Sequence, residues 1–122
     1  MQIYPFNGLF LIQHTACKAE YGNKDAERLS KLANLQSTIL QHAFKFPGLK
    51  KLVYSTCSVN VEENENVVND VMKHIGNQNF KLMEAMPSWK HRRGLQGQEM
   101  CLRVDQNIDL CTGFFVAVFQ RC

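Results

Sequence analysis

The sequence predicts an α/β fold that corresponds to the later half of an open sheet. The expected order of elements is helix, strand, helix, strand, loop, strand, strand, and such alternation is typical of sheets covered by helices. A parallel central strand needs neighbours on both sides, and residues 1–24 supply about one of them. The 122 residues, 45% of them hydrophobic, suffice for one domain with a core, so we expect a single, incomplete sheet.

Periodic apolar residues predict the first helix from Asp25 onward, and Pro47 with Gly48 ends it. The expected buried face is Leu29, Leu32, Ala33, Gln36, Leu40, Ala43 and Phe44.

A second helix is expected after Asn60, which forms a capping-box pattern with Glu63. Glu62, Glu63 and Glu65 would place negative charge on the positive end of the helix dipole, and Gly76 ends the helix. Its expected buried stripe is Val67, Val68, Val71, Met72 and Ile75.

Runs of apolar, β-branched and aromatic residues predict the strands. They cover residues 9–12, 49–56, 80–83, 100–104 and 113–120, and the last two runs would form a terminal antiparallel pair. Turns are expected at residues 4–8 and 21–23, and an exposed loop is expected at residues 87–98.

Composition restricts the class of protein only weakly. Fourteen basic and 11 acidic residues give a net charge of +3, which permits nucleic-acid binding without predicting it. Five cysteines without C-x-x-C spacing predict reduced thiols in an intracellular protein, and the four histidines lack ligand spacing, so no metal site is expected. The apolar stretch at residues 8–12 is too short to cross a membrane, and we expect a soluble protein.

Cys57 is the candidate catalytic residue, because it lies just past the end of a predicted strand and ahead of a helix. Backbone N–H groups and the positive helix end lower the pKa of a thiol in such a place. From position alone, a structural cysteine is the more common alternative. His42 could partner Cys57 in a thiol hydrolase, but no second member of a triad is visible.

The string Tyr-Ser-Thr-Cys-Ser at residues 54–58, followed by Glu-Glu-Asn-Glu-Asn-Val-Val at 62–68, resembles the nucleophile motif of the Sun-domain, or RsmB/NOP-type, RNA cytosine-5 methyltransferases. The preceding helix and the Gly-Phe-Phe-Val-Ala-Val-Phe strand extend the resemblance over about residues 26–120. Phe46-Pro47, Pro87-x-Trp89 and Cys-Leu-Arg at 101–103 are most similar to the eukaryotic branch that modifies large-subunit ribosomal RNA.

The resemblance implies a Rossmann-like class I methyltransferase sheet and S-adenosylmethionine as cofactor. It also implies that the Cys57 thiolate adds to cytosine C6, which makes C5 reactive enough to accept a methyl group, and that the target base is unpaired or extruded. Thr56 and Ser58 would shape the turn, while residues 63–65 would mostly form the helix start. The implied partner is large-subunit ribosomal RNA, in the nucleus or nucleolus.

A basic run beside Trp89 is the candidate RNA-binding site, since cations can contact phosphates and an aromatic ring can stack on a base. A merely solvated basic loop explains the same residues equally well. The candidate residues are Lys90, His91, Arg92 and Arg93.

Residues 1–24 depart from the family, so we expect a divergent segment there and the C-terminal part of the methyltransferase domain at 25–122. The sequence lacks the glycine-rich donor loop, the acidic residue for the ribose and the family's Asp-Ala-Pro-Cys-Ser-Gly segment. Cys17 has no proline or glycine in the corresponding places, and no role is assigned to it. The prediction is a truncated enzyme; the alternative is a non-catalytic RNA-binding or protein-interaction fragment of one.

Overall fold

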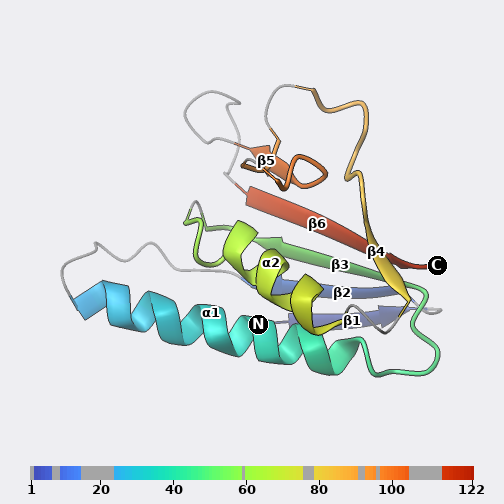
Figure 1. Ribbon diagram of the computed structural model, residues 1–122, viewed down its shortest axis with the longest axis horizontal. Coiled ribbons are helices and arrows are strands. Elements are labelled where there is room, and N and C mark those ends of the chain that lie inside the picture. The colour runs from blue at the N-terminus through green and yellow to red at the C-terminus, as the bar shows by residue number, and fades with distance from the viewer. Residues whose placement is uncertain are drawn as a thin grey trace.

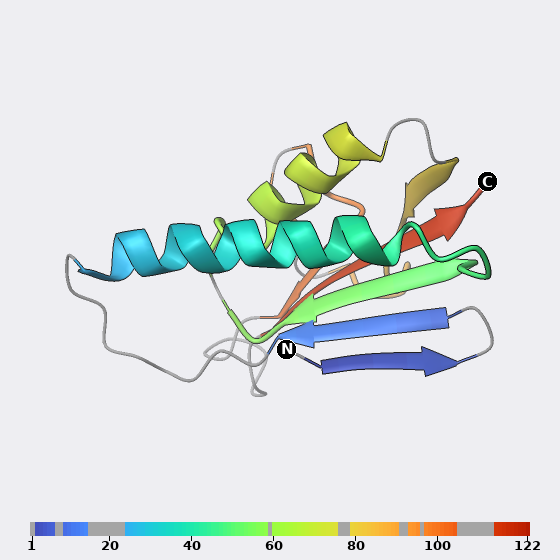
Figure 2. The ribbon, with the colours of Figure 1, turned by 90° about the horizontal axis from the view of Figure 1, so that it is seen from below.

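The structure is one mixed sheet with two helices side by side on the same face (Figure 1, Figure 2). This computed structural model describes residues 2–6, 9–14, 24–58, 60–75, 79–90, 93–95, 97–104 and 114–122. The helices are α1 (Lys24–Ala43) and α2 (Glu65–His74). The strands are β1 (Gln2–Phe6), β2 (Leu9–His14), β3 (Lys51–Thr56), β4 (Phe80–Met83), β5 (Leu102–Val104) and β6 (Phe114–Arg121).

The sheet has the strand order β1-β2-β3-β6-β4, and β5 also pairs with β6. Strands β2 and β3 run parallel, from Leu9 opposite Lys51 to His14 opposite Thr56. Strand β6 is antiparallel to β3, β4 and β5, so β4 points the same way as β3. These pairings confirm the predicted partial α/β sheet and its terminal antiparallel pair.

The amino-terminal strands correct one prediction. Where a turn was expected at residues 4–8, Gln2–Phe6 forms β1 and pairs antiparallel with β2, so two strands precede α1. Pro5 is compatible with β1, because a strand at the end of the sheet can leave one row of backbone positions without ladder partners. The turn expected at residues 21–23 and the segment around Cys17 lie outside the described residues.

The core lies between the sheet and the helices, because alternate residues of the strands face them. Phe44, at the end of α1, packs edge-to-face on Phe80 at 4.8 Å and on Phe119 at 5.1 Å between ring centroids. The fully or nearly fully buried core includes Ile12, Leu40, Leu49, Leu52, Tyr54, Val68, Val71, Phe115, Ala117 and Phe119.

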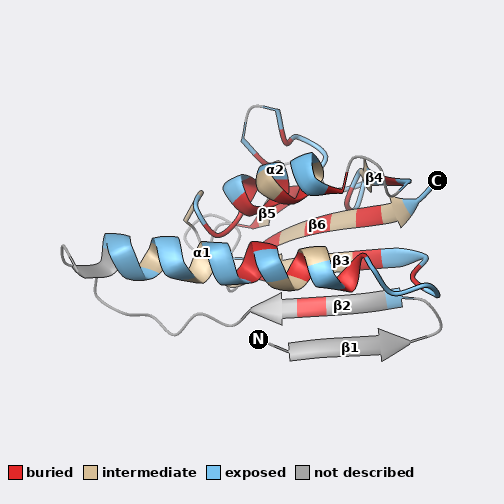
Figure 3. Cartoon of the chain, turned by 60° about the horizontal axis from the view of Figure 1, so that its bottom comes forward, coloured by how far each residue is buried: buried red, intermediate tan, exposed pale blue. Residues whose placement is uncertain are grey.

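Helix α1 is buried only in its second half (Figure 3). Gln36 and Leu40 are buried as predicted, whereas Leu29 and Leu32 are half-buried and Leu35 is 54% exposed. Helix α2 contacts α1 and covers β3 and β6 with its valine stripe. The turn that carries Cys57 therefore lies where both helices meet the carboxyl edge of the parallel strands.

Candidate functional site

Cys57 follows the last residue of β3, at the edge where the parallel strands β2 and β3 both end. Its side chain is half-buried and its thiol is free. Helix α2 begins eight residues later, at Glu65, so a turn with buried polar side chains separates the cysteine from the helix. The structure thus confirms the predicted location of Cys57; its role as nucleophile stays a prediction.

The turn is held on one side by Asn64, whose side chain is completely buried. Thr56 Oγ1 donates to Asn64 Oδ1 at 2.5 Å, and Asn64 Nδ2 donates to the carbonyl oxygen of Ser58 at 2.9 Å. The Ser58 N–H also donates to Thr56 Oγ1 at 3.3 Å. Asn64 therefore ties together the two residues that flank Cys57.

Glu63 holds the turn on the other side, with only 1% of its surface exposed. Its Oε2 accepts a hydrogen bond from Ser58 Oγ and one from Asn60 Nδ2 at 3.2 Å, and its Oε1 accepts one from Gln36 Nε2 at 3.4 Å. Tyr54 Oη donates to the Glu63 carbonyl oxygen at 2.7 Å. Residues from β3, α1 and the turn itself converge on this glutamate.

The predicted capping box is therefore wrong. Helix α2 starts at Glu65 with Asn64 as its N-cap, and the Asn64 side chain makes no capping hydrogen bond. Glu63 bonds the Asn60 side chain inside the turn, before the helix begins. The two residues do form a hydrogen bond, as their spacing predicted, but the bond lies within the turn and does not cap the helix.

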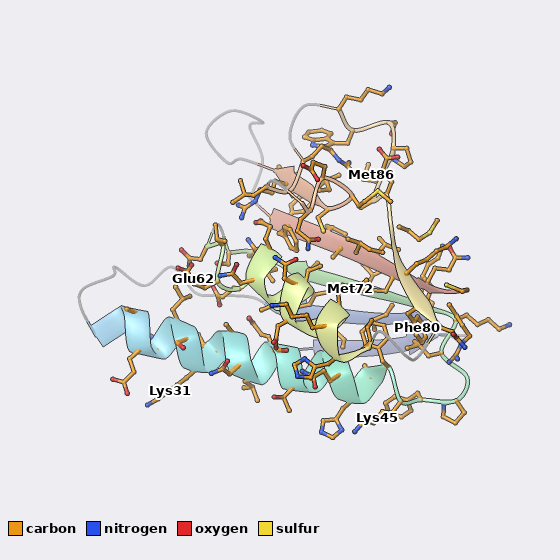
Figure 4. The ribbon with its side chains drawn as sticks, viewed as in Figure 1. Lys31, Lys45, Glu62, Met72, Phe80 and Met86 are labelled. Carbon is orange, nitrogen blue, oxygen red and sulfur yellow. The ribbon has the colours of Figure 1, made fainter. Side chains whose placement is uncertain are left out.

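The three acidic residues of this segment have different surroundings. Glu62 is exposed on the turn before α2 (Figure 4), Glu63 is buried, and Glu65 lies in the first turn of α2 at 3% exposure. Glu65 Oε1 accepts from Arg103 Nε at 2.9 Å and Glu65 Oε2 accepts from Arg103 Nη2 at 2.7 Å. The Arg103 guanidinium also lies 5.8 Å from the centroid of the Phe115 ring.

Two other titratable groups near the turn stay neutral at physiological pH. Burial raises the pKa of Tyr54 strongly, and the carboxylate of Glu63 raises it further, so Tyr54 acts as a hydrogen-bond donor. Burial, together with Glu65, raises the pKa of Cys101 to about 12 against the opposing effect of Arg93 and Arg103. Neither group is suited to act as a nucleophile or base.

The described residues of the loop at 84–101 are partly buried and hydrogen-bonded, whereas the sequence predicted an exposed loop at 87–98. The Arg93 guanidinium donates to the carbonyl oxygens of Ala85 at 2.7 Å, Trp89 at 3.2 Å and Met100 at 2.8 Å. It also bonds the carbonyl oxygens of Met86 and Glu99. Several residues of the loop are buried in consequence, namely Ala85, Gly94, Gln98 and Cys101.

The candidate RNA-binding residues have unequal surroundings in this loop. Lys90 is exposed, Arg93 is half-buried among carbonyl groups, and His91 and Arg92 lie outside the described residues. Trp89 is half-buried, and its Nε1 donates to the Arg103 carbonyl oxygen at 3.2 Å. Trp89, Lys90 and Arg93 line one surface cavity of about 420 Å³ with Glu84, Pro87 and Glu99.

The described residues do not fit a complete site for S-adenosylmethionine. Such a donor binds where a glycine-rich turn follows a strand at the carboxyl edge of a parallel sheet. The described glycines, Gly48, Gly94 and Gly97, lie elsewhere, and β1 runs antiparallel so that its end at Phe6 is opposite Leu9, at the far edge from Cys57. Within the described ranges there is also no cluster suited to a metal and no helix able to span a membrane.

Sequence reasoning missed the supporting residues of this site. Asn64 and Gln36 were taken as helix residues, and Arg103 only as part of a family likeness. A weak signal existed for Gln36, which is a polar residue on an otherwise apolar helix face. Arg103 and Glu65 are 38 residues apart, and no local spacing rule relates them.

The chain is similar in sequence to known rRNA methyltransferases. The family model for 16S rRNA methyltransferase RsmB/F matches residues 9–120. The chain is 51% identical to the 26S rRNA (cytosine-C(5))-methyltransferase nsun-5 of Caenorhabditis elegans, over 82% of this chain and 24% of that protein. It is 47% identical to the 28S rRNA (cytosine-C(5))-methyltransferase of Mus musculus, over 82% of this chain and 22% of that protein. The chain thus spans about a quarter of the length of these relatives.

Solved structures share the fold. A methyltransferase homolog protein from Pyrococcus horikoshii superposes with a TM-score of 0.66 at 22% identity, over 92% of this chain and 39% of that one. NSun6 from Pyrococcus horikoshii with SFG gives a TM-score of 0.59 at 29% identity, over 73% of this chain and 22% of that one. Together with the match over residues 9–120, these likenesses show that the chain belongs to the 16S rRNA methyltransferase RsmB/F family, with large-subunit rRNA methyltransferases among its relatives.

Proposed function

We propose that this chain carries the nucleophilic-cysteine part of an RNA cytosine-5 methyltransferase that acts on large-subunit ribosomal RNA. The observation that carries the proposal is the half-exposed Cys57 at the carboxyl edge of β2 and β3, between two residues fixed by hydrogen bonds. Family membership and the large-subunit rRNA relatives support the substrate class.

The chemistry needs a nucleophile because cytosine C5 does not react readily by itself. In the proposed step the Cys57 thiolate forms a bond to C6, and the electrons of the C5–C6 double bond move to C5, which would then take the methyl group. Loss of the C5 proton re-forms the double bond and expels the Cys57 thiolate. The base must reach the thiol from outside, as an unpaired or extruded nucleotide. A half-buried thiol at the open edge of the sheet is compatible with that approach.

Cofactor, RNA contact and location complete the proposal. S-adenosylmethionine would supply the methyl group, and no described residue is assigned to it. Lys90, together with His91 and Arg92, would contact RNA from the loop beside Trp89. Arg93, the fourth candidate, would support this contact by holding the loop through its bonds to carbonyl oxygens, and the exposed Lys90 is the more accessible of the two described cations. A ribosomal RNA substrate would be consistent with a protein of the nucleus or nucleolus.

The decisive experiment is covalent trapping. The chain is incubated with S-adenosylmethionine and large-subunit rRNA fragments that carry 5-azacytosine, and the cross-linked product is resolved on a denaturing gel. We expect an adduct that is lost in Cys57→Ala and kept in Cys122→Ala, which removes an exposed cysteine. An adduct that survives Cys57→Ala would overturn the assignment of the nucleophile.

A second candidate is a non-catalytic RNA-binding or protein-interaction fragment of such an enzyme. It is favoured by the absence of a donor turn among the described residues and by the antiparallel β1 beside β2. Calorimetric titration with S-adenosylmethionine separates the two candidates, because only the first requires donor binding. No heat of binding and no adduct, from a chain shown to be folded by circular dichroism, would favour the second candidate.

A further inference from the structure

We propose that Glu63 is a positioning residue for Cys57. Its buried carboxylate, with the Asn64 side chain, fixes the backbone on both sides of the cysteine. The catalytic consequence of this inference rests on the proposed function, whereas its structural part is independent of it.

The first step in the argument is the Ser58 hydroxyl. It has one hydrogen, which it donates to Glu63 Oε2, and this leaves its lone pairs for the Asn60 N–H at 3.0 Å. Because the carboxylate can only accept, it sets the direction of the hydroxyl, which in turn holds the Asn60 amide. Removing the acceptor frees the hydroxyl to rotate and weakens the hold on the turn after Cys57.

The second step is the pairing of Glu63 with Asn64. Glu63 holds the side chain of Ser58, while Asn64 holds its carbonyl oxygen and the hydroxyl of Thr56. The residues before and after Cys57 are therefore both attached to the same two-residue segment. Cys57 is left with a fixed backbone and a partly accessible thiol.

The third step concerns burial. Removing a carboxylate from water is costly unless its oxygens are hydrogen-bonded, and negative charge at a helix start is served as well by an exposed side chain. Glu62, one residue earlier, is such an exposed carboxylate. Glu63 is only 1% exposed and accepts hydrogen bonds from Ser58, Asn60 and Gln36. This burial indicates that Glu63 stabilises the turn and does not serve the helix dipole.

Substitution by glutamine separates hydrogen bonding from charge. The Gln36 side-chain oxygen is buried and has no hydrogen-bond partner within the described part of the chain. If the Gln36 amide rotates, this oxygen can accept from the amide introduced by Glu63→Gln, while the remaining oxygen still accepts from Ser58. We therefore expect Glu63→Gln to preserve the turn and Glu63→Ala to lose it.

Amide hydrogen exchange tests the structural part without any activity. In the 122-residue chain, Glu63→Ala should speed exchange at Ser58 and Asn60 by about tenfold, while amides in the middle of α2 keep their protection. Glu62→Ala is the control, because it removes a carboxylate from the same turn but from the exposed side. Ser58→Ala removes the same link from its other end and should speed exchange at Asn60. Unchanged exchange at Asn60 in folded Glu63→Ala would overturn the inference.

The catalytic part is tested by the rate of adduct formation on 5-azacytosine RNA. Glu63→Ala should lower the maximal rate by up to about 100-fold with the RNA concentration at half-maximal rate unchanged, and Glu63→Gln should stay within about threefold of the wild-type rate. A wild-type rate in Glu63→Ala would reject the positioning role and leave Cys57 as nucleophile. If the wild-type chain forms no adduct, the proposed function fails, and hydrogen exchange alone decides the role of Glu63.

Discussion

Two irregular segments, the turn at residues 57–64 and the loop at residues 84–101, are each organised by one charged side chain, and the two charges are opposite. The described residues of both segments are irregular and partly buried, so their polar groups need partners that water would otherwise provide. In the turn, the Glu63 carboxylate accepts from two side chains, the Ser58 hydroxyl and the Asn60 amide. The loop has carbonyl oxygens to satisfy, and a guanidinium, Arg93, donates to them.

The comparison shows that a charged residue in an irregular segment can be buried even where the sequence suggests a role at the surface. The carboxylates before α2 were expected to interact with the helix dipole, and the cations of the loop with RNA. In the structure Glu63 and Arg93 are instead turned inward. Glu63 accepts from side chains of the turn, and Arg93 donates to carbonyl oxygens of the loop. The exposed neighbours, Glu62 and Lys90, remain available for surface roles.

The largest expected effect comes from the ion pair between α2, which follows the turn, and β5, which follows the loop. Arg103→Met leaves the Glu65 carboxylate, 4% exposed, without its guanidinium, and we expect a loss of about 3–5 kcal/mol in the free energy of unfolding. Urea denaturation measures it. Replacing both residues, as Arg103→Met with Glu65→Leu, should cost less than Arg103→Met alone. An equal or greater cost would mean that packing on Phe115, rather than the unpaired charge, dominates.

Arg93→Lys sharpens the comparison within the loop. An ammonium group has three donors in place of the guanidinium that serves five carbonyl oxygens, so at least two carbonyl bonds are lost. We expect a loss of about 2 kcal/mol, read from the urea midpoint at constant slope. A midpoint equal to that of the wild type would show that water replaces the guanidinium at no cost.

Alkaline pH tests the burial of Cys101, the last residue of the loop. Since its pKa is raised to about 12 in the folded state, the unfolded chain loses the thiol proton first, near pH 8.5. The stabilisation is complete below that pH and falls by about 1.4 kcal/mol per pH unit above it. Cys101→Ala should lower stability at pH 7 but show a shallower decline between pH 8.5 and 10, in denaturation curves at each pH. Parallel declines would place the titration in another group.

The smallest effect on stability is expected for Lys90, the exposed neighbour of Arg93. Lys90→Ala should change the free energy of unfolding by less than about 0.5 kcal/mol. If Lys90 contacts an RNA phosphate, the salt dependence of RNA binding should fall by about 0.7 in log–log slope. Lys45→Ala is the control, because Lys45 is exposed near the end of α1, away from the carboxyl edge of β3 (Figure 4). Equal slopes in both variants would leave Lys90 as a solvated surface residue.

The sequence by itself determined the parts of the fold that depend on local pattern. Periodicity located α1 and α2, and runs of apolar, β-branched and aromatic residues located β3 and β6, because each of these patterns lies within a few consecutive residues. The motif around Cys57 identified the family, since its residues are contiguous. The place of Cys57 at the end of β3 followed from these two predictions together.

Tertiary structure alone decided how those elements meet. The insertion of β6 between β3 and β4 and the pairing of Glu65 with Arg103 join residues that are far apart in the sequence, so no local pattern encodes them. Strand β1 was missed for another reason, since Pro5 and Asn7-Gly8 are typical of a turn. Packing also decided that Glu63 and Arg93 turn inward, where Glu63 accepts from buried side-chain donors and Arg93 donates to backbone carbonyl oxygens. The sequence shows which charged residues are present, but the packing of segments distant in sequence determines which of them are buried and which remain exposed to water.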